Sequence, residues 1–298
     1  MAEMTKRGDM RDGAWMEEWG ELEGGGCFVA SGVRGGYATT EGGFGRFGGD
    51  TTGVMVRSSS GEVLVADAGT GFPRLASVLN GLEGFSLFVS HPHLDHIQGI
   101  FYLDTFKKAG KRVTIYCEGH VREAIETLCA PPFLPRRLSQ FASPPQWHVL
   151  KSVDGFETPS FLARVMPLVH PGGAQGIALV DKPTRRSLMI LTDVEMEHGI
   201  PVGEQPALAA VCAVAAELGG VDTLIVDAPF APADFPQCKG MGHSDYATAA
   251  ALARHIGATR TYLSHHAPGA TDEALAERSG RIGDGNVQLL AQWEPHRF

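Results

Sequence analysis

The chain has 298 residues, of which 43% are hydrophobic and 20% are charged, a composition typical of a soluble globular protein. Its formal net charge of −9 argues against a protein whose main task is to bind a nucleic-acid backbone. The sequence contains no apolar run of about 18 residues, and its five cysteines are odd in number, so we expect a cytoplasmic protein without membrane spans.

The N-terminal residues 1–26 mix charged residues with glycine and predict a flexible arm. Trp15 and Trp19 in this arm are expected to pack on the body or on a partner subunit, which leaves a homodimer open. A glycine-dense stretch follows at residues 27–50, and it leads into a strand-like segment rather than a helix, which disfavours a phosphate-binding loop. We find no linker after residue 26 and predict one domain over residues 27–298.

Hydrophobic patterning predicts the remaining elements in chain order. Strands are expected at 54–56, 63–66, 84–90, 112–117, 147–152, 161–169, 177–180, 187–191, 222–227, 259–264 and 287–292, and helices at 97–106, 121–129, 206–218, 245–256 and 271–281. Two strand-rich runs with alternating strands and helices indicate an α+β fold, in which two mixed sheets pack face to face with helices outside.

The predicted strand 84–90 is followed at once by the hexapeptide His91–His96, which reads His-Pro-His-Leu-Asp-His. Period-two spacing places His91 and His93 on one side of the backbone, and Asp95 and His96 can turn toward a second point. Imidazole and carboxylate groups are good ligands for divalent ions such as zinc. The hexapeptide therefore predicts a metal-binding loop at the end of a strand.

Three further candidate ligands follow apolar predicted strands far along the chain, namely His170, Asp193 and His265. Charged groups at the ends of buried strands are rare without a partner, so a shared metal site is the favoured interpretation. His266 is adjacent to His265, and either residue could be the ligand, although the strand end favours His265.

The hexapeptide has the form His-x-His-x-Asp-His and resembles the signature of the metallo-β-lactamase superfamily. Three other segments resemble its phosphodiesterase branch, which includes ribonuclease Z. They are Arg46-Phe47-Gly48-Gly49-Asp50-Thr51, Asp67-Ala68-Gly69-Thr70-Gly71 and Gly242-His243-Ser244. The resemblance implies an αββα sandwich with a metal site at one edge.

The resemblance also implies a role for each candidate residue. One divalent ion would be held by His91, His93 and His170, a second by Asp95, His96 and His265, and Asp193 would bridge them. Zinc is the expected metal, with manganese or iron as alternatives. Asp67 would hold the metal loop by hydrogen bonds rather than bind metal. His243 would donate a proton to the leaving group, and Asp95 is grouped with it as a catalytic residue.

The predicted function is hydrolysis of a small phosphodiester, such as a cyclic nucleotide, by a hydroxide that two metal ions share. A lactonase or another acyl or thioester hydrolase is the alternative. A tRNA 3′ endonuclease is disfavoured, because known examples carry a long arm, often between the residues matching His170 and Asp193, where this chain is short. A non-catalytic metal-binding protein is disfavoured by the complete ligand set.

Overall fold

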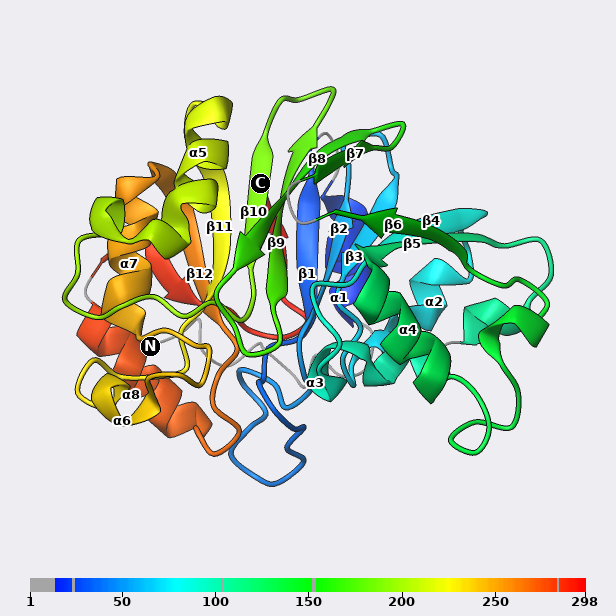
Figure 1. Ribbon diagram of the computed structural model, residues 1–298, viewed down its shortest axis with the longest axis horizontal. Coiled ribbons are helices and arrows are strands. Elements are labelled where there is room, and N and C mark those ends of the chain that lie inside the picture. The colour runs from blue at the N-terminus through cyan, green and yellow to red at the C-terminus, as the bar shows by residue number, and fades with distance from the viewer. Residues whose placement is uncertain (1–13, 23–24, 103, 152–153, 283) are drawn as a thin grey trace.

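A computed structural model describes residues 14–22, 25–102, 104–151, 154–282 and 284–298 (Figure 1). The first of two seven-stranded sheets in this part of the chain has the order β14-β1-β2-β3-β4-β5-β6. Its strands are β1 (Cys27–Gly32), β2 (Gly53–Arg57), β3 (Val63–Ala66), β4 (Gly84–Phe88), β5 (Arg112–Glu118), β6 (Gln146–Leu150) and β14 (Pro295–Arg297). Strands β3 to β6 run parallel, and the others pair antiparallel.

The second sheet repeats this plan in the order β13-β12-β11-β10-β9-β8-β7. Its strands are β7 (Asp154–Glu157), β8 (Phe161–Leu168), β9 (Ala174–Asp181), β10 (Ser187–Leu191), β11 (Val221–Asp227), β12 (Ala258–Ser264) and β13 (Val287–Leu289). Strands β10 to β13 are parallel. Strand β8 has the same direction as β10, because both pair antiparallel with β9.

Helices lie on the outer faces of both sheets and in loops at the sheet edges. They are α1 (Ala14–Glu21), α2 (Ala76–Leu79), α3 (Leu94–Ile97), α4 (Gly119–Leu128), α5 (Ala209–Leu218), α6 (Phe235–Cys238), α7 (Tyr246–His255) and α8 (Asp272–Ile282). Figure 1 shows α2 and α4 on one side of the strands and α5, α7 and α8 on the other. This layering confirms the predicted αββα sandwich. No described helix is long and apolar enough to cross a membrane.

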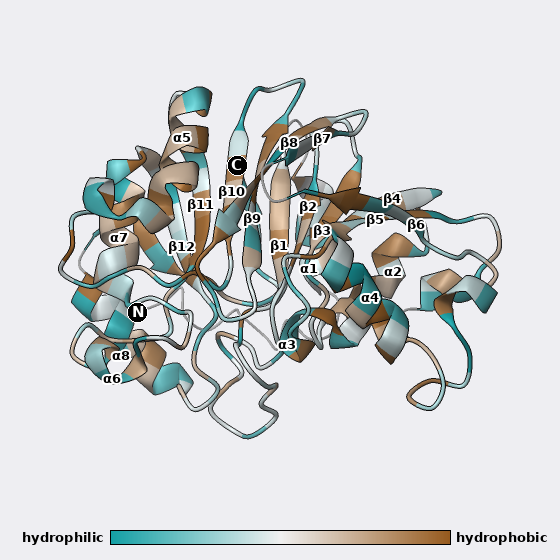
Figure 2. Cartoon of the chain, viewed as in Figure 1, coloured by the Kyte–Doolittle hydropathy of each residue, from teal (hydrophilic) through white to brown (hydrophobic). Residues whose placement is uncertain are grey.

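Three apolar layers hold the sandwich together. Buried side chains from both sheets, including Phe28, Ile177 and Ile190, fill the layer between them. Two further clusters lie under the outer helices, one beside the first sheet and one beside the second. Figure 2 shows the same division, with hydrophobic residues concentrated in the strands and hydrophilic stretches on the helices and loops. Burial on both faces makes each sheet a rigid support for the loops at its edges.

Some elements differ from the sequence-based expectations. Strand β1 lies within the glycine-dense stretch, pairs along both edges and is fully buried, because its two faces pack in different apolar clusters. The helix expected over 97–106 is replaced by α3 and two short 3₁₀ segments, Gln98–Tyr102 and Asp104–Lys107.

The predicted N-terminal arm contains helix α1, and its remaining residues 1–13 and 23–24 lie outside the described residues. Trp15 stacks on Trp293 with ring centroids 5.1 Å apart, and the Arg57 guanidinium lies 4.8 Å from the ring of Trp19. The two tryptophans are therefore buried on the body of the same chain, one of the two placements expected for them.

Candidate metal centre

The candidate site lies where strands of both sheets end at one edge of the sandwich. Strands β3 and β4 run parallel in the first sheet, and β8, β10 and β12 share a direction in the second. The residues that follow these strand ends are Asp67, His91–His96, His170, Asp193 and His265. Carboxyl ends of parallel strands meet at one edge, so residues far apart in the sequence become neighbours.

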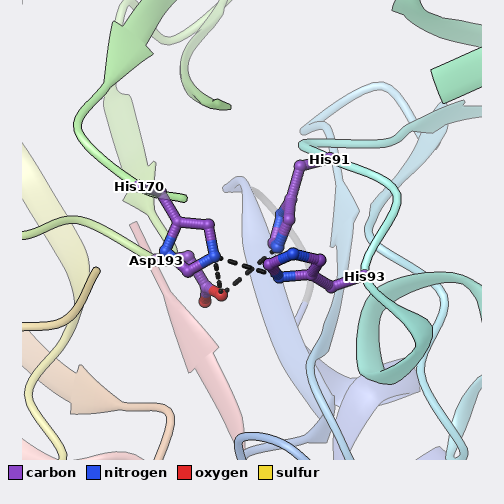
Figure 3. A group of neighbouring side chains, drawn as sticks. All are labelled: His91, His93, His170 and Asp193. Carbon is purple, nitrogen blue, oxygen red and sulfur yellow. Dashed lines mark hydrogen bonds and ion pairs between the residues drawn. The ribbon is translucent and has the colours of Figure 1, made fainter. Parts of the chain in front are cut away.

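The first group of side chains contains His91, His93, His170 and Asp193, whose ligand atoms all lie within 4.8 Å of one another. Figure 3 shows the four side chains pointing toward one another, with His91 and His93 on one loop and His170 and Asp193 on other segments. Asp193 Oδ2 lies 3.3 Å from His91 Nε2 and 3.5 Å from His170 Nε2. His170 Nε2 is 3.0 Å from His93 Nδ1. Three imidazoles and one carboxylate oxygen therefore surround one point.

The second group contains Asp95, His96 and His265, again within 4.8 Å. The other oxygen of Asp193, Oδ1, lies 3.3 Å from His96 Nε2 and 3.1 Å from His265 Nδ1. Asp193 therefore turns one carboxylate oxygen to each group, as a bridging ligand would. The local backbone separates the groups, because His93 is extended and α3 begins at Leu94, which redirects Asp95 and His96.

The structure brings together all seven predicted ligands. It also shows which of the adjacent residues His265 and His266 faces the cluster. The ring of His266 donates from Nε2 to the carbonyl oxygen of Leu290 at 2.9 Å and lies away from the cluster. The His265 ring instead approaches the backbone of Gly35, where an added Cβ would come within 2.2 Å of Nε2. His265 is therefore the neighbour placed to bind metal, and binding itself stays a prediction.

Hydrogen bonds from outside the two groups hold several of these side chains. The buried Asp67 carboxylate accepts from Ser90 N at 2.8 Å, Ser90 Oγ at 2.9 Å and His96 Nδ1 at 2.9 Å. His170 Nδ1 donates to the carbonyl oxygen of Gly242 at 2.9 Å. The bonds from His96 and His170 fix the orientation of each ring and leave the opposite nitrogen facing the cluster. The supporting role predicted for Asp67 agrees with this geometry.

Two further contacts hold the second group and were not expected from the sequence. Gly36 N donates to Asp95 Oδ2 at 2.8 Å, and Thr52 Oγ1 lies 3.1 Å from His265 Nδ1. Gly36 lies in the glycine-dense region and Thr52 lies next to it. No residue type in that region indicates that it supports a metal-binding side chain. A metal-binding motif does not encode contacts with a distant loop, so sequence spacing offered no signal for them.

The centre of the cluster fits a cation. Among the described residues, His91 Nε2, His96 Nε2 and Asp193 Oδ1 are buried and make no hydrogen bond. These atoms lie 3.1–3.3 Å from one another or from other ligand atoms, without hydrogen-bond geometry. A buried polar atom without a hydrogen bond typically costs about 1–3 kcal/mol, and a bound cation would offset that cost. Imidazole nitrogen and carboxylate oxygen suit zinc, manganese and iron. The donor set therefore fits a divalent metal.

The pKa values of the histidines agree with this fit. Burial lowers the pKa of both His170 and His265 to about 4, so their rings are neutral at pH 7 and carry a lone pair that can bind metal. Burial also opposes protonation of His96, but the carboxylates of Asp193 and Asp67 outweigh it and raise its pKa well above the usual value. The field at the centre of the cluster therefore favours positive charge.

His243 lies beside the cluster and is held by a carboxylate. Its Nδ1 donates to Asp227 Oδ2 at 2.8 Å, and its ring stacks 4.7 Å from that of His265. Burial opposes protonation of His243, but its hydrogen bond to Asp227 and the nearby negative charges outweigh it and raise its pKa. A carboxylate that fixes one nitrogen and favours the protonated ring is typical of a general acid.

Asp227 itself was missed as a site residue, although it ends β11 much as Asp193 follows β10. That shared position was the signal that could have found it. Ser244 donates from Oγ to the carbonyl oxygen of Val194. The cap of α7 is Asp245, whose side chain accepts from the backbone N–H of two residues in the first turn. His243 is thus fixed by Asp227 and by the anchored residues that follow it.

Three solved structures with the same fold each match more than nine-tenths of this chain. They are a diphosphatase from the PhnP family (18% identity, 92% of this chain and 97% of that chain, TM-score 0.63), YhfI from Bacillus subtilis (16%, 92% and 99%, 0.70) and the short form of human tRNase Z (20%, 91% and 98%, 0.63). No curated protein sequence matches significantly. The model of the beta-lactamase superfamily domain matches residues 64–266, more than half of the chain. With this match and the αββα fold, the chain belongs to the metallo-β-lactamase superfamily.

Proposed function

We propose that this member of a superfamily of metal-dependent hydrolases cleaves a small phosphodiester and uses His243 as its proton donor. The observation that carries the proposal is the pair formed by His243 and Asp227, with 2.8 Å between Nδ1 and Oδ2. The pair borders the metal cluster, and His243 also lies close enough to Asp193 and His265 to form a third candidate group with them. The seven predicted ligands nevertheless supply two groups without His243. A histidine that is not needed for metal binding is available for proton transfer.

The two groups of ligands would hold two divalent ions, with Asp193 between them. Such ions, when bound, lower the pKa of water and stabilise negative charge on a phosphoryl oxygen. The protein's own residues orient the ligand nitrogens toward the two groups. Asp67 fixes His96 and Gly242 fixes His170.

The proton for the leaving group comes from His243 in this proposal. Water oxygen adds to phosphorus and releases one proton to the solvent, the bond from phosphorus to the leaving oxygen breaks, and the proton on His243 Nε2 moves to that oxygen. His243 then takes up a proton from the solvent. Asp227 keeps Nδ1 protonated and stabilises the charged ring before transfer. Since an alkoxide is a poor leaving group, its protonation lowers the barrier most for unactivated diesters.

The described geometry supports this proposal over its rivals. Hydrolysis of a carbonyl substrate depends less on a dedicated proton donor. A lactonase would therefore have no clear use for the His243–Asp227 pair. The tRNA endonuclease is disfavoured by the segment between His170 and Asp193, which in this chain consists of β9 and β10 joined by a short turn. That segment is described throughout and contains no inserted arm, and the net charge of −9 disfavours a large polyanionic substrate.

A comparison of two leaving groups tests the proton donor. The metal-loaded wild type and His243→Ala are assayed on methyl 4-nitrophenyl phosphate and on dimethyl phosphate or another dialkyl diester. We expect a loss of about 10²- to 10⁴-fold on the dialkyl diester and a much smaller loss on the nitrophenyl diester, which needs no proton. Metal content is measured for each protein and should stay unchanged.

His198→Ala is the matched control, because His198 also donates to a buried aspartate, from Nδ1 to Asp245 Oδ2 at 2.9 Å. It should leave the ratio of the two rates unchanged. Equal losses on both substrates in His243→Ala would assign His243 to substrate or metal positioning and contradict the proposal. Cleavage of lactones with no turnover of any phosphodiester would favour the acyl hydrolase instead.

A further inference from the structure

Several large apolar side chains are exposed immediately beside residues of the metal cluster. Tyr37, Leu94, Val169 and Met241 have exposed fractions of 64%, 58%, 47% and 56%. Single exposed apolar residues are ordinary on protein surfaces. Here four of them are each a sequence neighbour of a ligand or of a residue hydrogen-bonded to one, so their backbones lie at one site. Exposed apolar residues that gather at one site mark a binding surface. We call these four side chains the apolar rim.

Backbone contacts tie Tyr37 and Leu94 of the rim to the second metal group. Tyr37 follows Gly36, whose N–H donates to Asp95 Oδ2 at 2.8 Å. Leu94 directly precedes Asp95, at the first position of α3. Both side chains therefore start from backbone that contacts or carries the same ligand.

The other two rim residues adjoin the first metal group. Val169 directly precedes His170, and its carbonyl oxygen accepts from the N–H of Glu195 at 2.8 Å. Met241 precedes Gly242, whose carbonyl oxygen accepts from His170 Nδ1. The rim therefore borders both groups of ligands.

A fifth apolar side chain lies on the side of the proton donor. The ring of Phe230 is half-buried and stands edge-on to the ring of His243, with 6.2 Å between centroids. An apolar ring beside a general acid excludes water from the place where the leaving oxygen must sit. The apolar character of the surroundings thus extends from the ligands to the proton donor.

The basic residues nearest to the rim in the sequence are already engaged. The Arg34 guanidinium is buried and donates to the carbonyl oxygens of Gly48, Ala267 and Ala270. Lys239 Nζ pairs with Glu197 Oε2 at 3.1 Å. Neither cation is placed to bind additional phosphates. A nucleic-acid chain or an oligophosphate needs such cations, whereas an uncharged group does not.

We propose that the apolar rim binds an uncharged alkyl or aryl arm of the substrate, so that the substrate class is a phosphodiester with a hydrophobic arm rather than a nucleotide chain. This inference rests on the proposed function. The phosphoryl group would lie at the metal cluster, and the arm would cover the rim side chains. Removal of their apolar surface from water would then supply binding free energy.

A series of 4-nitrophenyl phosphodiesters with methyl, butyl and octyl arms tests the inference, because the leaving group is constant. Full burial of one methylene is worth about fourfold in affinity, so a partly open rim should raise kcat/KM by about twofold per methylene. Thymidine 5′-(4-nitrophenyl phosphate), which has a polar arm, should be a poorer substrate than the octyl ester. A flat series, or a preference for the thymidine arm, would overturn the inference.

Variants of rim residues test whether the dependence of kcat/KM on arm length arises at the apolar rim. Met241→Ser and Leu94→Ser should lower the ratio of octyl to methyl rates by severalfold each, with metal content measured because Leu94 lies within the ligand loop. Val149→Ser is the matched control. Val149 is 49% exposed on the edge strand β6 and should leave the ratio unchanged. Unchanged ratios in both rim variants would contradict the assignment.

Three outcomes separate this inference from the proposed function and from another occupant. Turnover of the methyl ester without any chain-length dependence would refute the rim and leave phosphodiester hydrolysis intact. No turnover of any ester in the series would refute the function itself. A flat series together with a dimer that Met241→Ser dissociates, measured by sedimentation, would assign the rim to a second copy of the chain and overturn the inference.

Discussion

Replacing Asp67 with asparagine tests whether the metal cluster depends on a carboxylate that does not itself face the centre. Asp67 is 2% exposed, and its Oδ2 accepts from His96 Nδ1 at 2.9 Å and from Ser90 Oγ at 2.9 Å. A third donor, Thr192 Oγ1, lies 3.3 Å from the same oxygen. The ring of His96 is therefore oriented by an acceptor with a full negative charge.

The structure sets the expected size of the effect. The asparagine side chain would keep one oxygen, which can serve Ser90 N–H, and would turn an amide NH₂ toward His96 Nδ1. The lost hydrogen bond to a charged group is worth about 1.5–3 kcal/mol, so the free energy of unfolding of the metal-free protein should fall by about 2 kcal/mol. Loss of the partner that orients a metal-binding histidine typically weakens metal affinity about 10- to 100-fold.

The assay combines urea unfolding in a chelator with a metal-competition titration. Asp181→Asn is the matched control, since Asp181 is also fully buried and accepts from Ser59 N and Ser59 Oγ, far from the cluster. It should lose similar stability and keep its metal affinity. If Asp67→Asn binds metal within about twofold of wild type, the orienting role is wrong. Equal weakening in both variants would show that metal affinity merely follows global stability.

Three further outcomes follow from the site. Gly35→Ala should displace His265, because the new Cβ would lie 2.2 Å from Nε2, and mass spectrometry of metal content should show loss of one of two ions. Asp193→Ala should bind neither ion tightly, whereas two retained metals and normal activity would refute the bridge. In the metal-free protein, the charge of Asp227 holds the pKa of His243 above its ordinary value, so the ring loses its proton only as pH rises through that raised pKa. Asp227→Asn should move the titration of His243, followed by NMR, to lower pH, and an unmoved titration would contradict the pairing.

Much of the site could be predicted because its chemistry is local to strand ends. His170, Asp193 and His265 each follow an apolar run that forms a strand, and the strands converge at one edge of the sandwich. Burial makes such positions intolerant of polar groups without a partner. A few strongly polar residues after apolar strands therefore carry information about three-dimensional proximity that ordinary surface residues do not.

The parts that could not be predicted depend on pairing between distant segments. Strand β1 is a strand because β2 and β14 bond both of its edges, although its sequence is rich in small residues and lies in a glycine-dense stretch. Asp227 acquires its role only when α7 begins close to the end of β11 and delivers His243 to it. Local propensity is a weak signal where tertiary contacts decide the outcome.

The backbone at the site gives an independent argument that these residues are kept for binding rather than for stability. Asp67, Asp193 and His265 have φ values of 60°, 60° and 57°, in the left-handed region. Such a conformation costs about 1–3 kcal/mol for a residue other than glycine, although Asp tolerates it better than most. Glycine at any of these positions would relieve the strain and would also remove a carboxylate or an imidazole from the cluster. A bound cation would stabilise the folded state by mass action and offset both the strain and the desolvated ligand atoms. The strain is therefore understandable as the cost of turning the chain sharply after each strand, so that Asp193 and His265 face the centre and Asp67 reaches His96.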